Sequence, residues 1–306
     1  MSAVAAVRSR ALSAVTFRRL AVATAVALYA IVVSGATVRL TSSGLACESW
    51  PGCEPGSFFP ASSHHGFVEC GNRFVSLFPI VLTLIVWLGA RRVPGLPRWV
   101  GWLALGTFAG TIGQAPLGLL TIRSGLHPLL VASHFLLALV VLAGGIAVAL
   151  EARRLEVGRG LPLVPVRVRQ GGLIVAAAAL ALVVTGTLAT AAGPHPGSAD
   201  VGRLGNLVHA VYVHVRATAV FGSGLLLLAA YLVRRRRELP DASRIALALL
   251  AAVVAQMAVG ETQWRTRLPW GLVLVHVSLA AAIWALTVLL VYVLWRPPTR
   301  LGWTRH

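Results

Sequence analysis

Eight long apolar segments constrain the fold of this chain more than any other feature of its sequence. Of the 306 residues, 57% are hydrophobic and only 12% are charged. An α-helix needs about 20 mostly apolar residues to cross the hydrocarbon core of a bilayer. Segments of about this length occupy residues 20–38, 67–90, 99–121, 128–150, 171–192, 207–232, 244–262 and 270–295. The sequence therefore predicts an all-α polytopic membrane protein with eight transmembrane helices.

Polar residues inside these segments repeat at an interval of 142 residues. The pairs that coincide are Gln114 and Gln256, Gly118 and Gly260, Arg123 and Arg265, His134 and His276, and Asn72 and His214. Such self-similarity indicates duplication of a unit of four helices. We predict two four-helix bundles, residues 1–157 and 158–306, with the glycine- and proline-containing stretch 151–170 as the linker.

The net charge of +18 indicates membrane topology rather than nucleic-acid binding. All 27 basic residues are arginine, and most of them lie in alternate loops. Those flanking the first and last segments are Arg8, Arg10, Arg18, Arg19, Arg296, Arg300 and Arg305. Because cytoplasmic loops carry an excess of basic residues, we expect both termini in the cytoplasm. Each four-helix unit then begins and ends on the same side, so the two units form a parallel repeat.

Four polar residues lie at similar depth in segments that run in the same direction. Asn72, His134, His214 and His276 fall about five to seven residues, or roughly 8–11 Å, past the outer ends of their segments. A membrane histidine is costly without a partner, and haem iron commonly takes axial histidine. We predict that these residues face each other in pairs across bundle cores and that the histidines among them ligate haem iron. Alternatively, each histidine only hydrogen-bonds a neighbouring helix. His209 competes with His214, but repeat interval and depth favour His214.

Glu69 opens the second segment on the same helical face as Asn72, three residues further on. A carboxylate within the membrane boundary is paired, protonated or functional. One interpretation is a structural ion pair with Arg73, four residues along the helix. We favour a catalytic carboxylate, because the second repeat has Val211 at the equivalent position.

Two cysteines lie close together in the loop after the first segment. The spacing of Cys47 and Cys53 and their external, oxidising location predict a disulfide. Thiol redox chemistry or metal binding is the alternative, with His64 and His65 as the nearby ligands. Cys70, inside the second segment, is most simply a small buried residue.

Arg123 and Arg265 end the third and seventh segments at the outer face. Charge-assisted hydrogen bonds would allow these arginines to anchor haem propionates. Alternatively, their side chains only extend to the membrane interface.

Several stretches resemble the haem A synthase family across nearly the whole chain. They are ATVRLTSSGLACESWPGC after the first segment, VECGNR at the start of the second, HFLLAL in the fourth and HVSLAAAIWA in the eighth. The resemblance implies an enzyme that oxidises a ring methyl group of haem O, through hydroxylation, to the formyl group of haem A for cytochrome c oxidase. It also implies a plasma-membrane location, with the haem sites toward the outer face.

The resemblance assigns roles to individual residues. The implied roles are haem b cofactor ligation by His214 and His276, substrate-haem ligation by His134, turnover by the carboxylate of Glu69, and a loop disulfide of Cys47 and Cys53. Asn72 stands where the family usually has histidine, and an amide is a poor iron ligand. His134 alone is then expected to hold the substrate haem. The electron acceptor is not implied, and a haem O-making prenyltransferase is a candidate partner.

Two other functions compete with haem A synthesis. A b-type cytochrome that only relays electrons, such as a membrane reductase, needs the haem ligands but has no need of Glu69. A haem transporter or chaperone would also account for internal repeats. It predicts broken helices around a midplane site, whereas the polar residues here cluster near the outer ends of the segments.

Overall fold

The computed structural model describes residues 11–60, 62–198 and 201–299. Its helices are α2 (Ala14–Leu40), α3 (His64–Val75), α4 (Leu77–Ala90), α5 (Arg98–Arg123), α6 (Pro128–Val157), α7 (Val166–Ala192), α8 (Leu207–Arg234), α9 (Pro240–Arg265) and α10 (Trp270–Trp295). Eight stretches of the described chain are long and apolar enough to cross a membrane, and α3 and α4 together form one of them. The predicted all-α protein with eight membrane-spanning helices is confirmed.

The second apolar segment differs from the single helix expected for residues 67–90. It begins earlier, at His64, where the hydroxyl of Ser63 accepts a hydrogen bond from the N–H of Gly66. It is then interrupted at Ser76, between α3 and α4. Pro79 explains the interruption, because proline has no N–H to donate to the carbonyl of Val75 and its ring crowds that carbonyl. The short helix α3 therefore carries Glu69 and Asn72 on an element of its own.

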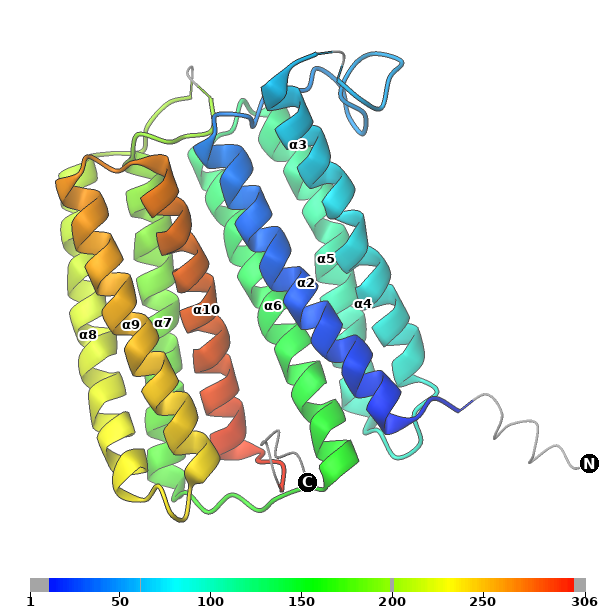
Figure 1. The fold of residues 1–306 in the computed structure, drawn as a ribbon, viewed down its shortest axis with the longest axis vertical. Helices are drawn as coiled ribbons and strands as arrows, with labels where there is room; N and C mark the ends of the chain where they lie inside the picture. Colours follow the sequence, from blue (N-terminus) through cyan, green and yellow to red (C-terminus); the bar gives the residue numbers. More distant parts are fainter. Residues whose placement is uncertain (1–10, 61, 199–200, 300–306) are drawn as a thin grey trace, which may run out of the picture.

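The helices pack as two neighbouring groups that share one interface (Figure 1). Helices α2, α4, α5 and α6 contact one another, as do α7, α8, α9 and α10, and α10 also lies against α2 and α6. Two hydrogen bonds cross this interface. The indole N–H of Trp284 donates to the backbone carbonyl of Leu139 at 2.9 Å, and the hydroxyl of Tyr29 donates to the backbone carbonyl of Ser278 at 3.1 Å. Each group also has its own apolar core, which includes the fully buried Phe17 in the first and Phe221 in the second. The domain boundary at residues 157 and 158 stays a prediction.

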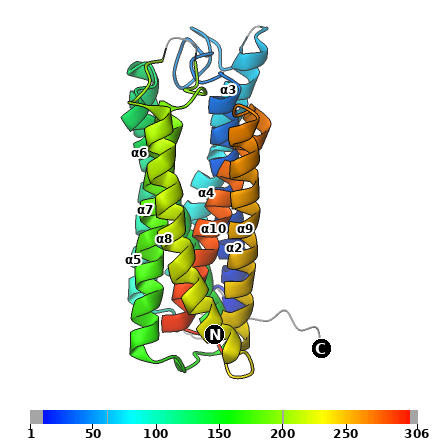
Figure 2. The same ribbon diagram turned by 90° about the vertical axis from the view of Figure 1, so that its left-hand side faces the viewer.

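Helices α3, α6, α8 and α10 all begin at the end of the molecule that carries the loop with Cys47 and Cys53 (Figures 1 and 2). We call this the disulfide end. The arginine-rich loop Arg234–Arg237 lies at the opposite end, between α8 and α9. Arg8, Arg10, Arg300 and Arg305, on which the predicted cytoplasmic location of the termini also depends, lie outside the described residues.

At the end opposite the disulfide, a buried carboxylate joins the two groups of helices. Glu151 of α6 accepts hydrogen bonds from Arg154 and Arg296, each at 2.7 Å, and from the hydroxyl of Tyr292 in α10. Its side chain is only 1% exposed. The hydrogen bond to Glu151 raises the pKa of Arg296 further, so this guanidinium stays charged. The expected linker is also shorter than residues 151–170, because α6 continues to Val157 and α7 begins at Val166.

Candidate functional site

The structure brings the rings of His214 in α8 and His276 in α10 close together, in an edge-to-face arrangement. Their ring centroids lie 6.4 Å apart, with the ring planes inclined by 66°. Two metal–nitrogen bonds of about 2 Å, with about 1.1 Å from each nitrogen to its ring centre, add to roughly 6 Å. The separation therefore suits a single iron held between the two imidazoles. His209 is exposed, and only its backbone N–H is used, in a bond to Asn206 at the start of α8.

Each of the two rings lies against a glycine of a neighbouring helix. A Cβ added to Gly186 would lie 2.9 Å from Cε1 of His214, and one added to Gly260 would lie 3.1 Å from Cε1 of His276. Contacts this short require the ring or the helix to move. In both rings Nδ1 is nearer the glycine than Nε2 is. Each imidazole is thus packed so that its Nδ1 edge faces a neighbouring helix.

The Nδ1 atoms differ in their hydrogen bonds. Nδ1 of His214 lies 3.2 Å from the hydroxyl of Thr185, one residue before Gly186. Nδ1 of His276 is buried and has no hydrogen-bond partner among the described residues, and the same holds for Oε1 of Gln256. The amide nitrogen of Gln256 donates to the carbonyl of His276 at 3.0 Å. Histidines that bind metals commonly donate their other N–H to a nearby acceptor, and the amide oxygen of Gln256 lies on the correct helix to be that acceptor.

The first half repeats this arrangement around His134. The amide nitrogen of Gln114 donates to the carbonyl of His134 at 3.2 Å, and a Cβ at Gly118 would lie 3.5 Å from Cε1 of the ring. Within the described chain, Nδ1 of His134 and Oε1 of Gln114 are again buried without partners. Asn72, opposite in the repeat, accepts a hydrogen bond through Oδ1 from the hydroxyl of Ser34 at 2.8 Å. The orphaned buried nitrogens and the glycine supports fit axial ligation of haem iron.

Glu69 is buried and fully engaged with the disulfide loop. Its Oε2 accepts the N–H groups of Ala46 and Cys47 at 2.8 and 2.9 Å, and its Oε1 accepts from Arg73 at 2.5 Å. Arg73 in turn donates to the carbonyl of Ser49 at 2.7 Å. The structural ion pair with Arg73 is therefore present. The loop contacts, which the sequence did not predict, mean that Glu69 and Arg73 together tie α3 to the loop.

The predicted disulfide between Cys47 and Cys53 is confirmed, with an S–S distance of 2.08 Å. Cys70 is a buried free thiol that packs against the same pair. Nδ1 of His65 lies 2.9 Å from the hydroxyl of Ser43. Within the described residues no group of three or more histidines, cysteines or acidic residues could hold a metal ion.

The two candidate propionate anchors lie at the disulfide end, and both are exposed. Arg265 pairs with Glu261 of its own helix at 2.5 Å, and Arg123 ends α5. Arg216, which was not among the predicted site residues, lies inside α8 only two residues after His214. Its guanidinium lies 3.8 Å from the ring centre of Tyr212. The signal for it was an arginine within a membrane-spanning segment, outside the arginine-rich loops.

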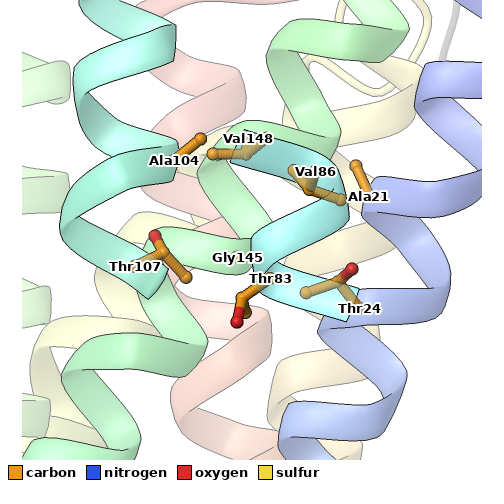
Figure 3. Close-up of a pocket in the computed structure, with 8 residues that line it drawn as sticks. All are labelled: Ala21, Thr24, Thr83, Val86, Ala104, Thr107, Gly145 and Val148. Carbon is orange, nitrogen blue, oxygen red and sulfur yellow. The ribbon is translucent and has the colours of Figure 1, made fainter. Parts of the chain in front are cut away.

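A small cavity within the first group of helices lies well away from the histidines. It measures about 10 Å³ and is lined by Ala21, Thr24, Thr83, Val86, Ala104, Thr107, Gly145 and Val148 (Figure 3). Along the axis of α6, Gly145 lies about 16 Å from His134, at a rise of 1.5 Å per residue. The hydroxyl groups of Thr24, Thr83 and Thr107 bond to carbonyls of their own helices. The cavity is a packing void and plays no part in the site.

Comparisons with known proteins agree on one family. The sequence matches the COX15-CtaA family, described as cytochrome oxidase assembly protein, over residues 18–66 and 61–288. A haem A synthase of Bacillus licheniformis is 34% identical over 125 residues, which cover 40% of this chain and 41% of that protein. One of Bacillus pumilus is 29% identical over 154 residues, 48% of this chain and 49% of that protein.

The chain thus spans about half or less of the length of these two relatives. It covers 92% of a haem A synthase of Shewanella oneidensis, with 25% identity over 314 residues. The family match extends over most of the chain and includes all the histidines described above. This chain therefore belongs to the cytochrome oxidase assembly protein family.

Proposed function

We propose that this chain is a haem A synthase, which oxidises a ring methyl group of haem O to the formyl group of haem A. The observation that carries the proposal is the pair of closely spaced imidazoles in one half, together with a third supported histidine in the other half. His214 and His276 lie 6.4 Å apart, whereas His134 has Asn72 as its counterpart. One half is thus equipped for a permanently ligated haem and the other for a haem that must be released.

In this proposal His214 and His276 hold haem b, and Thr185, Gly186 and Gly260 orient their rings. When bound, haem b supplies one-electron transfer chemistry. The hydroxyl of Thr185 would set the tautomer of His214, since the nitrogen that faces a hydrogen-bond partner is not the one that binds iron. Arg123 and Arg265 are candidate anchors for haem propionates at the disulfide end.

In the first half His134 would ligate the iron of haem O, and Glu69 would act on the protons or charge that develop at the methyl carbon. With water as the source of the formyl oxygen, conversion of methyl to formyl releases four electrons to the acceptor and four protons, so protons must leave this region. Glu69 lies one helical turn before Asn72 on α3, with two backbone N–H groups and Arg73 around its carboxylate.

The proposal includes a location and partners. The protein lies in the plasma membrane with both termini in the cytoplasm and the disulfide end outside, and residues 1–157 and 158–306 form the substrate and cofactor halves. Haem O is the substrate, an electron acceptor is required, and a prenyltransferase that makes haem O is the candidate supplier.

Haem extraction tests the proposed function. The chain is expressed with a haem O-making prenyltransferase in cells that make no haem A, and extracted haems are separated by chromatography. We expect haem A from the wild-type chain and unconverted haem O from His276→Ala. Accumulation of haem O alone by a wild-type chain that shows a low-spin b-type spectrum would instead support the electron-relay function.

A further inference from the structure

The arginine-rich loop Arg234–Arg237 surrounds an open hollow at the end of the molecule opposite the disulfide. The hollow measures about 420 Å³ and is lined by residues 233–238, which include four arginines and one glutamate. Its lining therefore has a formal charge of +3. The volume is far larger than one water molecule needs, and a lining of this charge attracts an anion.

Most of this charge has no counter-ion among the described residues. Of the four arginines, only Arg235 pairs with a carboxylate, that of Glu238, at 3.7 Å. Its guanidinium also lies 5.2 Å from the ring centre of Tyr231. Within the described chain the other three take part in no ion pair, and all four are exposed. Three guanidinium groups are thus available to a ligand.

Other arginines at the same end of the molecule have carboxylate partners. Arg18 pairs with Glu156, and Arg154 and Arg296 pair with Glu151. Those charges hold helices together. A topology signal needs only positive charge on one side of the membrane, and it does not account for a hollow lined by unpaired guanidinium groups.

Exposed apolar side chains continue from the loop along both helices that it joins. Leu227 lies seven residues before the end of α8 and Leu247 lies seven residues after the start of α9, so each is about 10 Å from the loop. Val220 and Val254 follow after another seven residues, and residues seven apart share nearly the same helical face. Each apolar stripe therefore extends about 20 Å, more than half of a hydrocarbon core of about 30 Å.

We propose that the loop Arg234–Arg237 binds the phosphate group of an anionic phospholipid, whose acyl chains lie along α8 and α9. Guanidinium groups form paired hydrogen bonds with phosphate oxygens, and basic clusters just beyond a transmembrane helix attract anionic lipids. In the proposed orientation the lipid belongs to the cytoplasmic leaflet. The inference goes beyond the proposed function and does not depend on it, because no histidine or haem takes part.

Inorganic phosphate offers the same anionic oxygens as a lipid headgroup but has no acyl chains. The exposed leucines and valines favour the lipid, since a free ion gains nothing from apolar side chains. The proposed site therefore distinguishes ligands twice, by the charge of the headgroup and by the presence of acyl chains.

Lipid titration of the purified full-length protein in detergent tests both distinctions. The probes are dioctanoyl phosphatidylglycerol and dioctanoyl phosphatidylcholine, and native mass spectrometry counts the bound molecules. We expect the anionic lipid to bind about tenfold more tightly than the neutral one. Inorganic phosphate at the same concentration should not displace the bound phosphatidylglycerol.

Two double variants provide a matched comparison. Replacement of Arg236 and Arg237 by glutamine removes two unpaired charges that lie beyond the end of α8, and should weaken phosphatidylglycerol binding by about tenfold or more. Replacement of Arg91 and Arg92 by glutamine removes the same charge from another loop at the same end, and should leave the affinity unchanged. All four side chains are exposed, so thermal unfolding should be the same in both variants.

Three results would overturn the proposal. Equal affinity of the two double variants would show that phosphatidylglycerol responds only to the total charge of this end. Equal binding of the neutral and anionic lipids would show that the arginines do not recognise the headgroup. Displacement by inorganic phosphate would assign the hollow to a free ion. None of these measurements involves haem, so the proposed function stands or falls separately.

Discussion

At the scale of single residues, the glycines beside the histidine rings differ in how much room they leave for a larger side chain. An added Cβ would lie 2.9 Å from the ring of His214 at Gly186, but 3.5 Å from the ring of His134 at Gly118. The first distance is below normal van der Waals contact and the second is ordinary contact. The same methyl group is therefore expected to have different effects at the two positions.

Gly186→Ala should displace the ring of His214 and weaken retention of the second-half haem by about tenfold, which corresponds to about 1.4 kcal/mol, within the range for overpacking. The ratio of haem to protein and the low-spin spectrum after purification measure the effect. Gly118→Ala is the control and should retain wild-type haem content. Equal losses in both variants would show that the helices, rather than the ring contacts, respond to the methyl group.

Glu69 combines two roles that a single substitution can separate. Glu69→Gln keeps the size of the side chain but removes the charge, so haem A formation should fall 10²–10⁴-fold if the carboxylate manages a proton. Haem b content and the disulfide should be unchanged, as measured by spectroscopy and thiol labelling. Glu48→Gln, at an exposed carboxylate of the same loop, is the control. Wild-type haem A in Glu69→Gln membranes would leave Glu69 with only its structural contacts to the loop and Arg73.

At the scale of elements, the contact between α6 and α10 depends on one carboxylate. Glu151 receives donors from Arg154 in its own helix and from Tyr292 and Arg296 at the end of α10. A carboxylate that is 1% exposed is stabilised only while its partners remain, and its removal leaves two guanidinium groups without their counter-ion.

Glu151→Gln should therefore lower the free energy of unfolding by about 3 kcal/mol, within the range for breaking a buried ion pair. Thermal unfolding in detergent measures the loss. Glu261→Gln is the matched control, because Glu261 is 59% exposed and pairs with an arginine of its own helix. Exposed pairs contribute about 1 kcal/mol at most. Equal stability of the two variants would show that Glu151 does not join the two groups of helices.

At the scale of the whole molecule, α10 packs against α2 and α6 and so joins the two groups of helices. His134, His214 and His276 lie within seven residues of the starts of α6, α8 and α10, which all begin at the disulfide end. The side of the membrane on which this end lies determines where haem O is processed. Arginine-rich loops at the other end predict that the disulfide end faces outward, where disulfides persist.

Labelling of single cysteines tests this orientation. In a Cys70→Ser background, Ser124→Cys at the disulfide end should react with a membrane-impermeant maleimide on intact cells. Arg236→Cys, at the opposite end, should react only after the membrane is permeabilised. Both positions are exposed, so access to the reagent depends on the membrane rather than on packing. The reverse pattern would invert the proposed topology.

The sequence by itself determined the helices and the disulfide, because both depend on local features. In lipid a helix satisfies its backbone hydrogen bonds within its own segment, so the length and apolarity of each segment were sufficient to predict it. The repeat also predicted which histidine of α8 turns toward His276, since duplicated positions keep the same helical face. Pro79 was visible in the sequence, but its separation of α3 from α4 was not predicted.

Only the tertiary structure decided which groups meet across helices. The contact of Glu69 with the N–H groups of Ala46 and Cys47, and that of Ser34 with Asn72, depend on how a loop folds back and how two helices are rotated. The hydrogen bonds of Tyr292 and Arg296 to Glu151 likewise join residues more than 140 positions apart. Hydropathy along one segment carries no information about rotation or distance between segments, and these contacts therefore required the packed chain.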